Sequence, residues 1–347
     1  MSFISLDNIS FSYSDIENGQ PYKNAVDGVS LNIEKGEFVA LLGHNGCGKS
    51  TVAKHLNAML LPDKGKVYVD GDDTSDENKT YDIREKVGLV LQNPDNQLVA
   101  SVVEEDVAFG PENLGIPPKE IRQRVDDALK AVDMYDYREH APFKLSGGQK
   151  QRISIGVALL MDPRLVIADE PVSALDVTVQ SQILNLLLKL HAEKQMTILF
   201  ISHDLNVVRG LCSRVMVIYK GVIVEEGLAE EIYEHPAHPY TKLLLEAAIG
   251  GDTMELDAEA GKQSAEPERD SRMEKPERGQ TKENLLENQE KDRSVQNAPK
   301  KIAGSGEKCI FYERCPKRRE ACAHVPLSPE AVQLSRTHWA RCIQIEA

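Results

Sequence analysis

The chain of 347 residues lacks any long apolar run. Its longest runs, such as Met196 to Ile201, are far below the roughly 20 residues that a membrane-spanning helix needs. The start of the chain, Met1 to Asp7, has no basic region followed by an apolar stretch, so it does not resemble a signal peptide. We therefore expect a cytosolic protein, for which any role at a membrane comes through a partner.

Positive charge and aromatic residues are both scarce. Lysine and arginine number 41 against 55 aspartates and glutamates, which gives a formal net charge of −14. Since binding to nucleic-acid phosphates needs concentrated Lys and Arg, we expect no nucleic-acid partner. Residues 251–306 contain no Phe, Tyr or Trp and are rich in charged residues, Gln, Pro and Ser. Such a segment buries too little apolar surface to offset its ordering entropy, so we predict a disordered linker there.

Cysteines are few and unevenly placed. Cys47 and Cys212 stand alone, whereas four crowd the C-terminus, at Cys309, Cys315, Cys322 and Cys342. In a reducing cytosol this crowding favours a metal or cluster site over disulfides. The sequence therefore predicts a small cysteine-rich module over residues 307–347.

Residues 1–250 alternate strand-like and helix-like segments, which is typical of an α/β domain with a mainly parallel sheet. Strands are predicted at residues 38–42, 66–69, 87–91, 165–168 and 197–202. Helices are predicted at residues 50–60, 118–132 and 149–160, and through Ile183, Leu187 and Leu190.

A glycine-rich loop follows the first of these strands and opens a helix. It consists of Gly43, His44, Asn45, Gly46, Cys47, Gly48, Lys49, Ser50 and Thr51. The glycines let backbone amides close around phosphates, and the positive end of the following helix favours the anion. In such a loop the lysine reaches the β- and γ-phosphates and the serine hydroxyl binds Mg²⁺, so Lys49 and Ser50 are the candidates.

An acidic pair ends a later buried strand, where residues 165–168 are followed by Asp169 and Glu170. Asp169 is placed to hold Mg²⁺ through water. Glu170, one residue further on, is the candidate that polarises the attacking water.

Between the glycine-rich loop and the acidic pair lies the octapeptide Leu145-Ser146-Gly147-Gly148-Gln149-Lys150-Gln151-Arg152. A phosphate loop followed by LSGGQ and then by Asp169-Glu170 resembles the nucleotide-binding subunits of ABC transporters. The resemblance covers residues 1–250. It implies a P-loop NTPase (RecA-like) α/β core with a helical subdomain at about residues 93–150, and an ATPase that encloses ATP between two such subunits.

The resemblance implies roles for further residues. Tyr13 matches the aromatic residue that stacks on adenine, and Gln92 matches the glutamine that senses Mg²⁺ and the membrane partner. Asp176 lies in the loop that joins the two sites, and His203 matches the switch histidine, a catalytic residue beside Glu170. The signature that closes over the γ-phosphate of the opposite subunit comprises Ser146, Gly147, Gly148 and Gln149. Cys47 stands where the family usually has Ser, Ala or Gly, and we expect its thiol to make the ATPase sensitive to alkylation.

The resemblance divides near residues 145–155. Upstream, Gln92–Leu98 and Ala108–Gly115 resemble the energy-coupling-factor ATPases, which drive vitamin and metal (cobalt) uptake. Downstream, Ala168–Val177 and His235–Thr241 resemble the oligopeptide, dipeptide and nickel importers. The four C-terminal cysteines resemble the C-terminal cluster of that second family, which carries a four-iron, four-sulfur centre. Zinc is the alternative, but the cysteine spacing is wider than in common zinc modules.

These resemblances imply solute import driven by ATP and Mg²⁺, with the chain held at the cytoplasmic face of the cell membrane as a peripheral subunit. The implied partners are a second ABC ATPase subunit, with a heterodimer favoured over a homodimer, transmembrane permease subunits and, indirectly, a solute-binding or capture subunit. The cargo stays open between the two families. A soluble regulatory ABC-type ATPase without a membrane partner is the alternative function. A non-hydrolysing subunit is disfavoured because Lys49, Asp169, Glu170 and His203 are all present.

Overall fold

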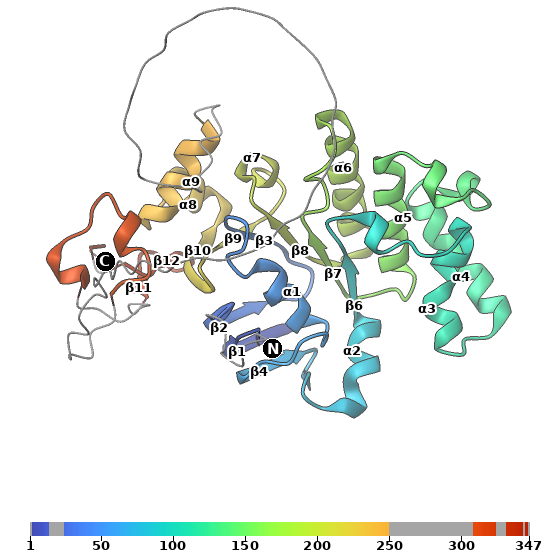
Figure 1. The fold of residues 1–347 in the computed structure, drawn as a ribbon, viewed down its shortest axis with the longest axis horizontal. Coiled ribbons are helices and arrows are strands. Elements are labelled where there is room, and N and C mark those ends of the chain that lie inside the picture. Colours follow the sequence, from blue (N-terminus) through green and yellow to red (C-terminus); the bar gives the residue numbers. More distant parts are fainter. Residues whose placement is uncertain (1, 14–23, 250–307, 324–330, 343, 346–347) are drawn as a thin grey trace, which may run out of the picture. The chain divides into compact units, whose positions relative to one another are not determined.

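The computed structural model describes residues 2–13, 24–249, 308–323, 331–342 and 344–345. The linker that we expect over residues 251–306 lies outside this described part. The described residues form two β-sheets with helices packed on them (Figure 1).

The larger sheet has eight strands in the order β11-β12-β10-β9-β3-β8-β7-β6. Its parallel part consists of β9 (Arg214–Tyr219), β3 (Phe38–Leu42), β8 (Thr197–Ser202), β7 (Leu165–Asp169) and β6 (Val87–Val90). The antiparallel extension consists of β10 (Val222–Leu228), β12 (Trp339–Ala340) and β11 (Val332–Gln333). The predicted parallel strands are confirmed, with bounds that agree to within one residue.

The central strand β3 is buried on both faces, which explains its unbroken apolar sequence. Val39 and Leu41 belong to one hydrophobic core, whereas Phe38, Ala40 and Leu42 belong to a second core on the opposite face. Because successive side chains of a strand point to opposite faces, a strand between two cores needs an apolar residue at every position.

A second, antiparallel sheet has the order β2-β1-β4-β5, with β1 (Ile4–Phe11), β2 (Val26–Ile33), β4 (Lys64–Val69) and β5 (Asp72–Asp73). The sequence predicted only the β4 segment of this sheet. In β1 the register with both neighbours shifts after the Leu6–Asp7 region, and Asn8 has a φ of 48°. These irregularities break the period-two alternation by which an isolated strand is found in a sequence.

Nine helices occur in the described residues. In chain order these are α1 (Lys49–Leu56), α2 (Thr80–Lys86), α3 (Val103–Asn113), α4 (Pro118–Ala131), α5 (Gly147–Leu159), α6 (Val177–Lys194), α7 (Leu205–Val208), α8 (Ala229–Glu234) and α9 (Pro239–Ile249). Short 3₁₀ turns lie at Glu77–Lys79, Pro94–Asn96, Tyr135–Tyr137, Pro142–Lys144, Tyr312–Arg314 and Glu320–Ala323. Helix α1 ends earlier than predicted, because Ala58 adopts a φ of 54° and the amides of Met59 and Leu60 bond back to the Lys54 carbonyl.

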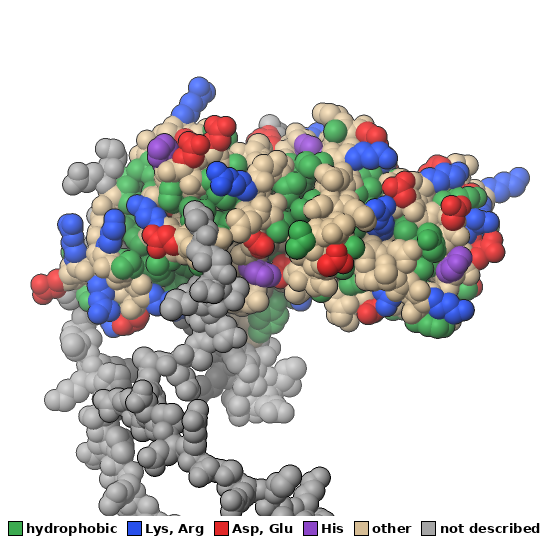
Figure 2. Space-filling model, turned by 90° about the horizontal axis from the view of Figure 1, so that it is seen from above, with side chains coloured by type: hydrophobic (Ala, Val, Ile, Leu, Met, Phe, Trp, Pro, Cys, Tyr) green, Lys and Arg blue, Asp and Glu red, His purple; other side chains and the backbone are tan. Residues whose placement is uncertain are grey.

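Different elements lie at the two edges of the larger sheet, helices at one and a pair of short strands at the other. Helices α3, α4 and α5 pack together beside β6, whereas the C-terminal residues add β12 and β11 beyond β10 (Figure 1). On the face drawn in Figure 2, acidic and basic side chains are interspersed. Among the described residues no helix is long and apolar enough to cross a membrane.

The two-sided burial of β3 predicts the cost of truncating it. Leu41→Ala removes a side chain with 0% exposure, so we expect it to lower the free energy of unfolding by about 2–5 kcal/mol. Leu61→Ala, at a position that is 49% exposed, is the matched control and should change it by less than about 0.5 kcal/mol. Chemical denaturation of both variants checks this, and equal losses would contradict the burial of β3.

Candidate active site

The glycine-rich loop connects β3 to α1, and two of its glycines are required by close backbone contacts. Gly48 has a φ of 107°, and a Cβ there would lie 2.4 Å from the Ala25 carbonyl oxygen. A Cβ on Gly43 would lie 2.4 Å from the Ile218 carbonyl oxygen. The loop is therefore held tightly between β9 and the start of β2, and its path admits no larger residue at either position.

Lys49, the first residue of α1, points back across this loop. Its Nζ donates hydrogen bonds to the carbonyl oxygens of Gly43 at 2.8 Å and His44 at 3.1 Å. It also forms an ion pair with Glu170 Oε1 at 3.2 Å, and the lysine side chain is only 4% exposed. A buried ammonium with these partners is a strong local source of positive charge on the loop.

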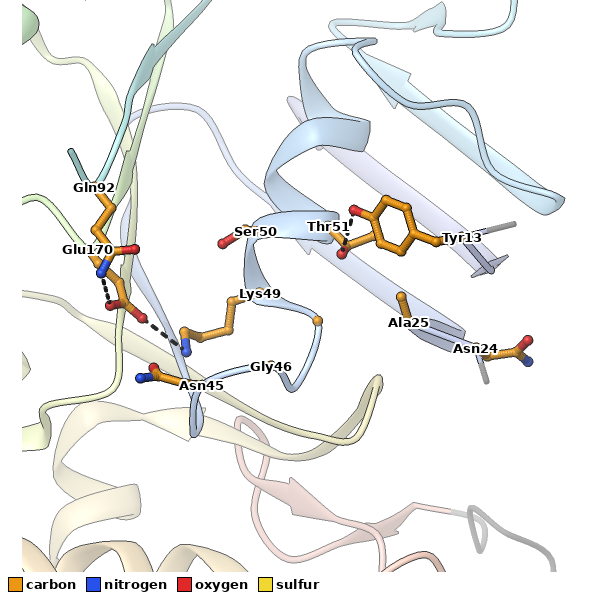
Figure 3. A pocket seen from close by; sticks show the side chains of 11 residues that line it. Tyr13, Asn24, Ala25, Asn45, Gly46, Lys49, Ser50, Thr51, Gln92 and Glu170 are labelled. Atoms are coloured by element: carbon orange, nitrogen blue, oxygen red, sulfur yellow. Dashed lines mark hydrogen bonds and ion pairs between the residues drawn. The ribbon is translucent and has the colours of Figure 1, made fainter. Parts of the chain in front are cut away.

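Three side chains from different strand ends converge on the carboxylate of Glu170. Besides Lys49, Gln92 Nε2 donates to Glu170 Oε2 at 3.2 Å, and His203 Nδ1 lies 3.1 Å from the same oxygen (Figure 3 shows the first two contacts). Glu170 follows β7 with a φ of 49°, a conformation that is uncommon for a residue with a side chain. Such strain is typical of functional positions, and here it turns the carboxylate toward the loop.

The electrostatics of this cluster keep Glu170 ionised. Burial raises the pKa of Glu170, but the hydrogen bond with His203 and the charge of Lys49 outweigh burial and bring the pKa below its ordinary value. The hydrogen bond to Glu170 raises the pKa of His203, against the effect of its partial burial. The carboxylate is therefore available as a proton acceptor at neutral pH.

Asp169, the last residue of β7, lies beside the start of α1. Burial raises its pKa, and a hydrogen bond with the Ser50 side chain lowers it in part. Its Oδ1 atom is buried and has no hydrogen-bond partner among the described residues. A buried carboxylate oxygen without a partner, next to a serine hydroxyl, is a donor set that suits Mg²⁺.

Lys49, Ser50, Gln92 and Glu170 line one cavity of about 740 Å³, whereas Gly43, Asp169 and His203 are not part of its lining. Its lining comprises Tyr13, Asn24, Ala25, Asn45, Gly46, Gly48, Lys49, Ser50, Thr51, Gln92 and Glu170 (Figure 3). Tyr13 stands at the outer end, 41% exposed, with its hydroxyl 3.2 Å from Thr51 Oγ1 and its ring edge-on to Phe11. Sequence reasoning did not find Asn24 and Ala25, because neither belongs to a motif.

The LSGGQ residues lie at the start of α5, outside this cavity. The Ser146 side chain accepts from the Gln149 amide at 3.3 Å, and the Gln149 side chain accepts from the Ser146 amide at 2.9 Å. This reciprocal cap leaves Ser146 and Gly147 exposed, while Gly148 is buried against Val179. Asp176 is exposed too and caps α6 by accepting from the Val179 amide.

The four C-terminal cysteines lie near one another at the 3₁₀ turns that follow residue 308 and at the end of β12. Burial raises the pKa of Cys309, Cys315 and Cys342, and the charges of neighbouring cysteines raise it further. The Cys309 amide donates to the Cys322 carbonyl at 3.1 Å. Within the described residues, no three His, Cys, Asp or Glu side chains meet closely enough to bind a single metal ion.

The structure does not support the expected reactivity of the Cys47 thiol toward alkylating reagents. Its side chain is 1% exposed and packs in the core with β3 and α1, and burial raises the pKa of its thiol. A buried, protonated thiol reacts slowly with alkylating reagents, so the expected sensitivity at this position does not fit the structure.

Comparison with known proteins places these features in a family. Residues 26–173 match the family model described as ABC transporter, and residues 224–279 and 276–322 match that described as oligopeptide/dipeptide transporter, C-terminal region. The energy-coupling factor transporter ATP-binding protein EcfA1 of Clostridium perfringens is 50% identical over 232 residues, which cover 67% of this chain and 82% of that protein. The protein of the same name from Clostridium novyi is 51% identical over 234 residues, with the same coverage of each chain.

Solved structures of ABC ATPases have the same fold as this chain. The structure of CbiO1 from Clostridium perfringens, part of the ABC transporter complex cbiONQ, superposes with a TM-score of 0.60 at 34% identity, over 67% of this chain and 91% of that one. A dimeric ATP-binding cassette in a post-hydrolysis state with ADP and phosphate gives a TM-score of 0.58 at 32% identity, over 65% and 98% of the two chains. The fold, the phosphate loop and the acidic strand end thus agree with sequence and structural likeness, and the chain belongs to the ABC transporter family as an ATP-binding, ATP-hydrolysing protein.

Proposed function

We propose that this chain is the ATPase subunit of an importer of the energy-coupling-factor type, in which ATP hydrolysis drives solute uptake. The observation that carries this proposal is the convergence of Lys49, Gln92 and His203 on the Glu170 carboxylate at the wall of the cavity. The likeness to EcfA1 proteins supports the type of transporter.

Glu170 is the proposed catalytic base. Its ionised carboxylate accepts a proton from the water that attacks the γ-phosphate, and His203 holds the carboxylate in place. Lys49 is the proposed phosphate ligand, and it exchanges Glu170 for phosphate oxygens when ATP enters. Asn45, Gly46, Gly48 and Thr51 contribute the rest of the phosphate-facing wall, and Tyr13 is the proposed adenine platform.

Asp169, Ser50 and Gln92 are the residues that would hold Mg²⁺, which when bound neutralises charge that develops on the phosphates. The Oδ1 atom of Asp169 fits this role because it is buried without a partner among the described residues.

The proposed functional unit contains two ATPase subunits. Ser146, Gly147 and Gln149 lie outside the cavity of their own chain, at the positive end of the 13-residue helix α5. The N-terminus of a helix binds anions well, so a second subunit can bring this surface to the γ-phosphate. The exposed Asp176 caps the start of α6 and is proposed to join the two sites.

The variant Glu170→Gln tests the catalytic assignment. It keeps the size of the side chain but removes the proton acceptor, so we expect ATP binding to persist, ATP turnover to fall by a factor of 10² or more, and an ATP-dependent dimer to accumulate. Turnover is measured by phosphate release and the dimer by size-exclusion chromatography with light scattering.

Glu193→Gln, at an exposed position on α6, is the matched control and should turn over ATP at the wild-type rate. A Glu170→Gln protein that hydrolyses ATP normally, or that stays monomeric with ATP bound, would show that the base or the two-subunit arrangement is wrongly assigned.

The groove between α3 and α4 is the proposed docking place for the permease. It has a volume of about 430 Å³, an apolar floor and a rim with three glutamates and one arginine. The floor comprises Ala108, Ile116, Pro118, Ile121 and Val125, and the rim comprises Glu104, Glu105, Glu112 and Arg122. This composition suits an amphipathic helix with basic residues beside its apolar face.

Reversal of the rim charge tests this docking place. We expect Glu105→Lys with Glu112→Lys to reduce the amount of permease that co-purifies from the host membrane by more than tenfold, because like charges then face each other. ATP turnover of the isolated chain should stay unchanged, since neither residue lines the nucleotide cavity. Glu85→Lys with Glu193→Lys is the control at exposed positions elsewhere. Equal recovery of permease with both double variants would rule the groove out, and the identity of the permease would name the cargo class.

The C-terminal cysteines are the proposed holders of a four-iron, four-sulfur cluster. Cys309, Cys315, Cys322 and Cys342 lie close enough to interact electrostatically with one another. Among the described residues they do not meet at a point as the ligands of a single metal ion would, but each thiolate of such a cluster binds a different iron, so the set fits a cluster better than a single ion. Four thiolates are the ligand set of such a cluster, which when bound supplies a rigid cross-link between the 308–323 segment and the end of β12. The match of residues 276–322 to the oligopeptide/dipeptide transporter region supports this.

Removal of one of these thiols tests the cluster. We expect Cys315→Ser to lose most of the iron found in the anaerobically purified wild-type protein, because three thiolates hold the cluster weakly. Cys212→Ser removes a thiol that is buried elsewhere, with a pKa raised to about 12, and should leave the iron content unchanged. Zinc in place of iron in the wild-type protein, or the same iron content in both variants, would contradict the proposal.

A further inference from the structure

A cluster of aromatic side chains connects the glycine-rich loop with the C-terminal module. Tyr240, near the start of α9, is 3% exposed, and Phe311, two residues after Cys309, is 2% exposed. Their ring centroids lie 5.7 Å apart, and both pack on Tyr219, at 4.6 Å from Tyr240 and 5.1 Å from Phe311. The His44 ring lies 5.4 Å from Tyr219, so the cluster extends into the loop itself.

The hydroxyl of Tyr240 bonds directly to the loop. It accepts a hydrogen bond from the His44 backbone amide at 3.0 Å and lies 3.1 Å from the Nδ1 atom of the same residue. His44 is also one of the two residues whose carbonyl oxygens accept from Lys49 Nζ. The position of Tyr240 thus affects the main chain that orients the lysine.

A second connection runs from Tyr240 to β12. The Tyr240 amide donates to His238 Nδ1 at 3.1 Å, and the His238 amide donates to Glu225 Oε2 at 2.9 Å. Glu225, with 0% exposure, also contacts His338 Nε2 at 2.7 Å. His338 directly precedes β12, so hydrogen bonds through four buried residues, Tyr240, His238, Glu225 and His338, link the loop to the C-terminal strand pair.

We propose that Tyr240 is a positioning residue of the nucleotide site, which acts through His44, and that through it the C-terminal module and nucleotide binding affect each other. The proposal rests on the nucleotide site described above. The physical reason is that Tyr240 is in contact with both parts: Phe311 and the Glu225 network hold its ring and main chain, and its hydroxyl holds the loop. Any change that shifts the module shifts the loop, and by linkage the reverse is also true.

The chain contains its own probe for this coupling. Trp339 is the single tryptophan, it lies on β12 next to His338, and it is absent from the lining of the nucleotide cavity. Fluorescence excited selectively in tryptophan therefore reports on the C-terminal module while nucleotide is added.

The test uses the full-length wild-type chain and Tyr240→Phe, titrated with MgADP. We expect Trp339 emission to change on saturation in the wild-type protein, and Tyr240→Phe to bind MgADP about fivefold more weakly, the factor expected for the loss of one net hydrogen bond, with a much smaller emission change. MgADP is chosen because it fills the cavity without requiring the two-subunit closure.

Tyr233→Phe is the matched control. Tyr233 is a partly buried tyrosine, whose hydroxyl donates to the Leu205 carbonyl at 2.6 Å, away from the loop. It should bind MgADP with wild-type affinity and show the wild-type emission change. Unchanged affinity in Tyr240→Phe would overturn the positioning role, and unchanged Trp339 emission in the saturated wild-type protein would overturn the coupling. A wild-type chain that fails to bind MgADP would instead contradict the nucleotide site itself.

Discussion

The parallel pairing of four neighbouring strands is the constraint on which the active site depends. Because β3, β8, β7 and β6 run in the same direction, their carboxyl ends meet at one edge of the sheet. The phosphate loop leaves β3 there, the Asp169-Glu170 pair ends β7, and His203 and Gln92 follow β8 and β6. Lys49, Gln92 and His203 are far apart in the sequence, yet the sheet brings all three side chains within hydrogen-bond or ion-pair distance of the Glu170 carboxylate.

The burial of that carboxylate explains why so many partners are needed. Taking an ion out of water is costly, and the cost is offset here by an ammonium, an amide and an imidazole that point at the same group. The same arrangement allows the pKa of Glu170 to change when nucleotide binds. If Lys49 turns to phosphate oxygens, Glu170 loses the charge of one partner that lowers its pKa and depends on Gln92 and His203, so the proton affinity of the proposed base rises as substrate binds. A base that strengthens when ATP is present is well suited to hydrolysis.

The sequence predicted the parallel strands β3, β6, β7 and β8, but not β9, and it predicted the loop, because each is a local pattern with strong physical requirements. Phe38–Leu42 is apolar at every position since both faces of β3 are buried, and Gly48 is required by its positive φ and by the Ala25 carbonyl. In the second sheet β4 was predicted, whereas β1 was missed because register shifts break its alternation. The positions of Asn24 and Tyr240 beside the loop were missed for another reason: Asn24 belongs to no motif, and the His235–Thr241 motif that contains Tyr240 does not show which segment it packs against.

The C-terminal module covers the edge strand β10 of the larger sheet. Without β12, strand β10 would be the edge of a large sheet and would expose unpaired backbone groups, which favour unwanted pairing with other chains. Pairing of Glu225 and Glu226 with Ala340 and Trp339 covers this edge. The buried Glu225 then makes the pairing specific, since its carboxylate is satisfied only when His338 and the amides of Ala237 and His238 are all in place. An appended segment that must satisfy a buried carboxylate docks in one register, and the same C-terminal module contributes Phe311, which contacts Tyr240 beside the phosphate loop.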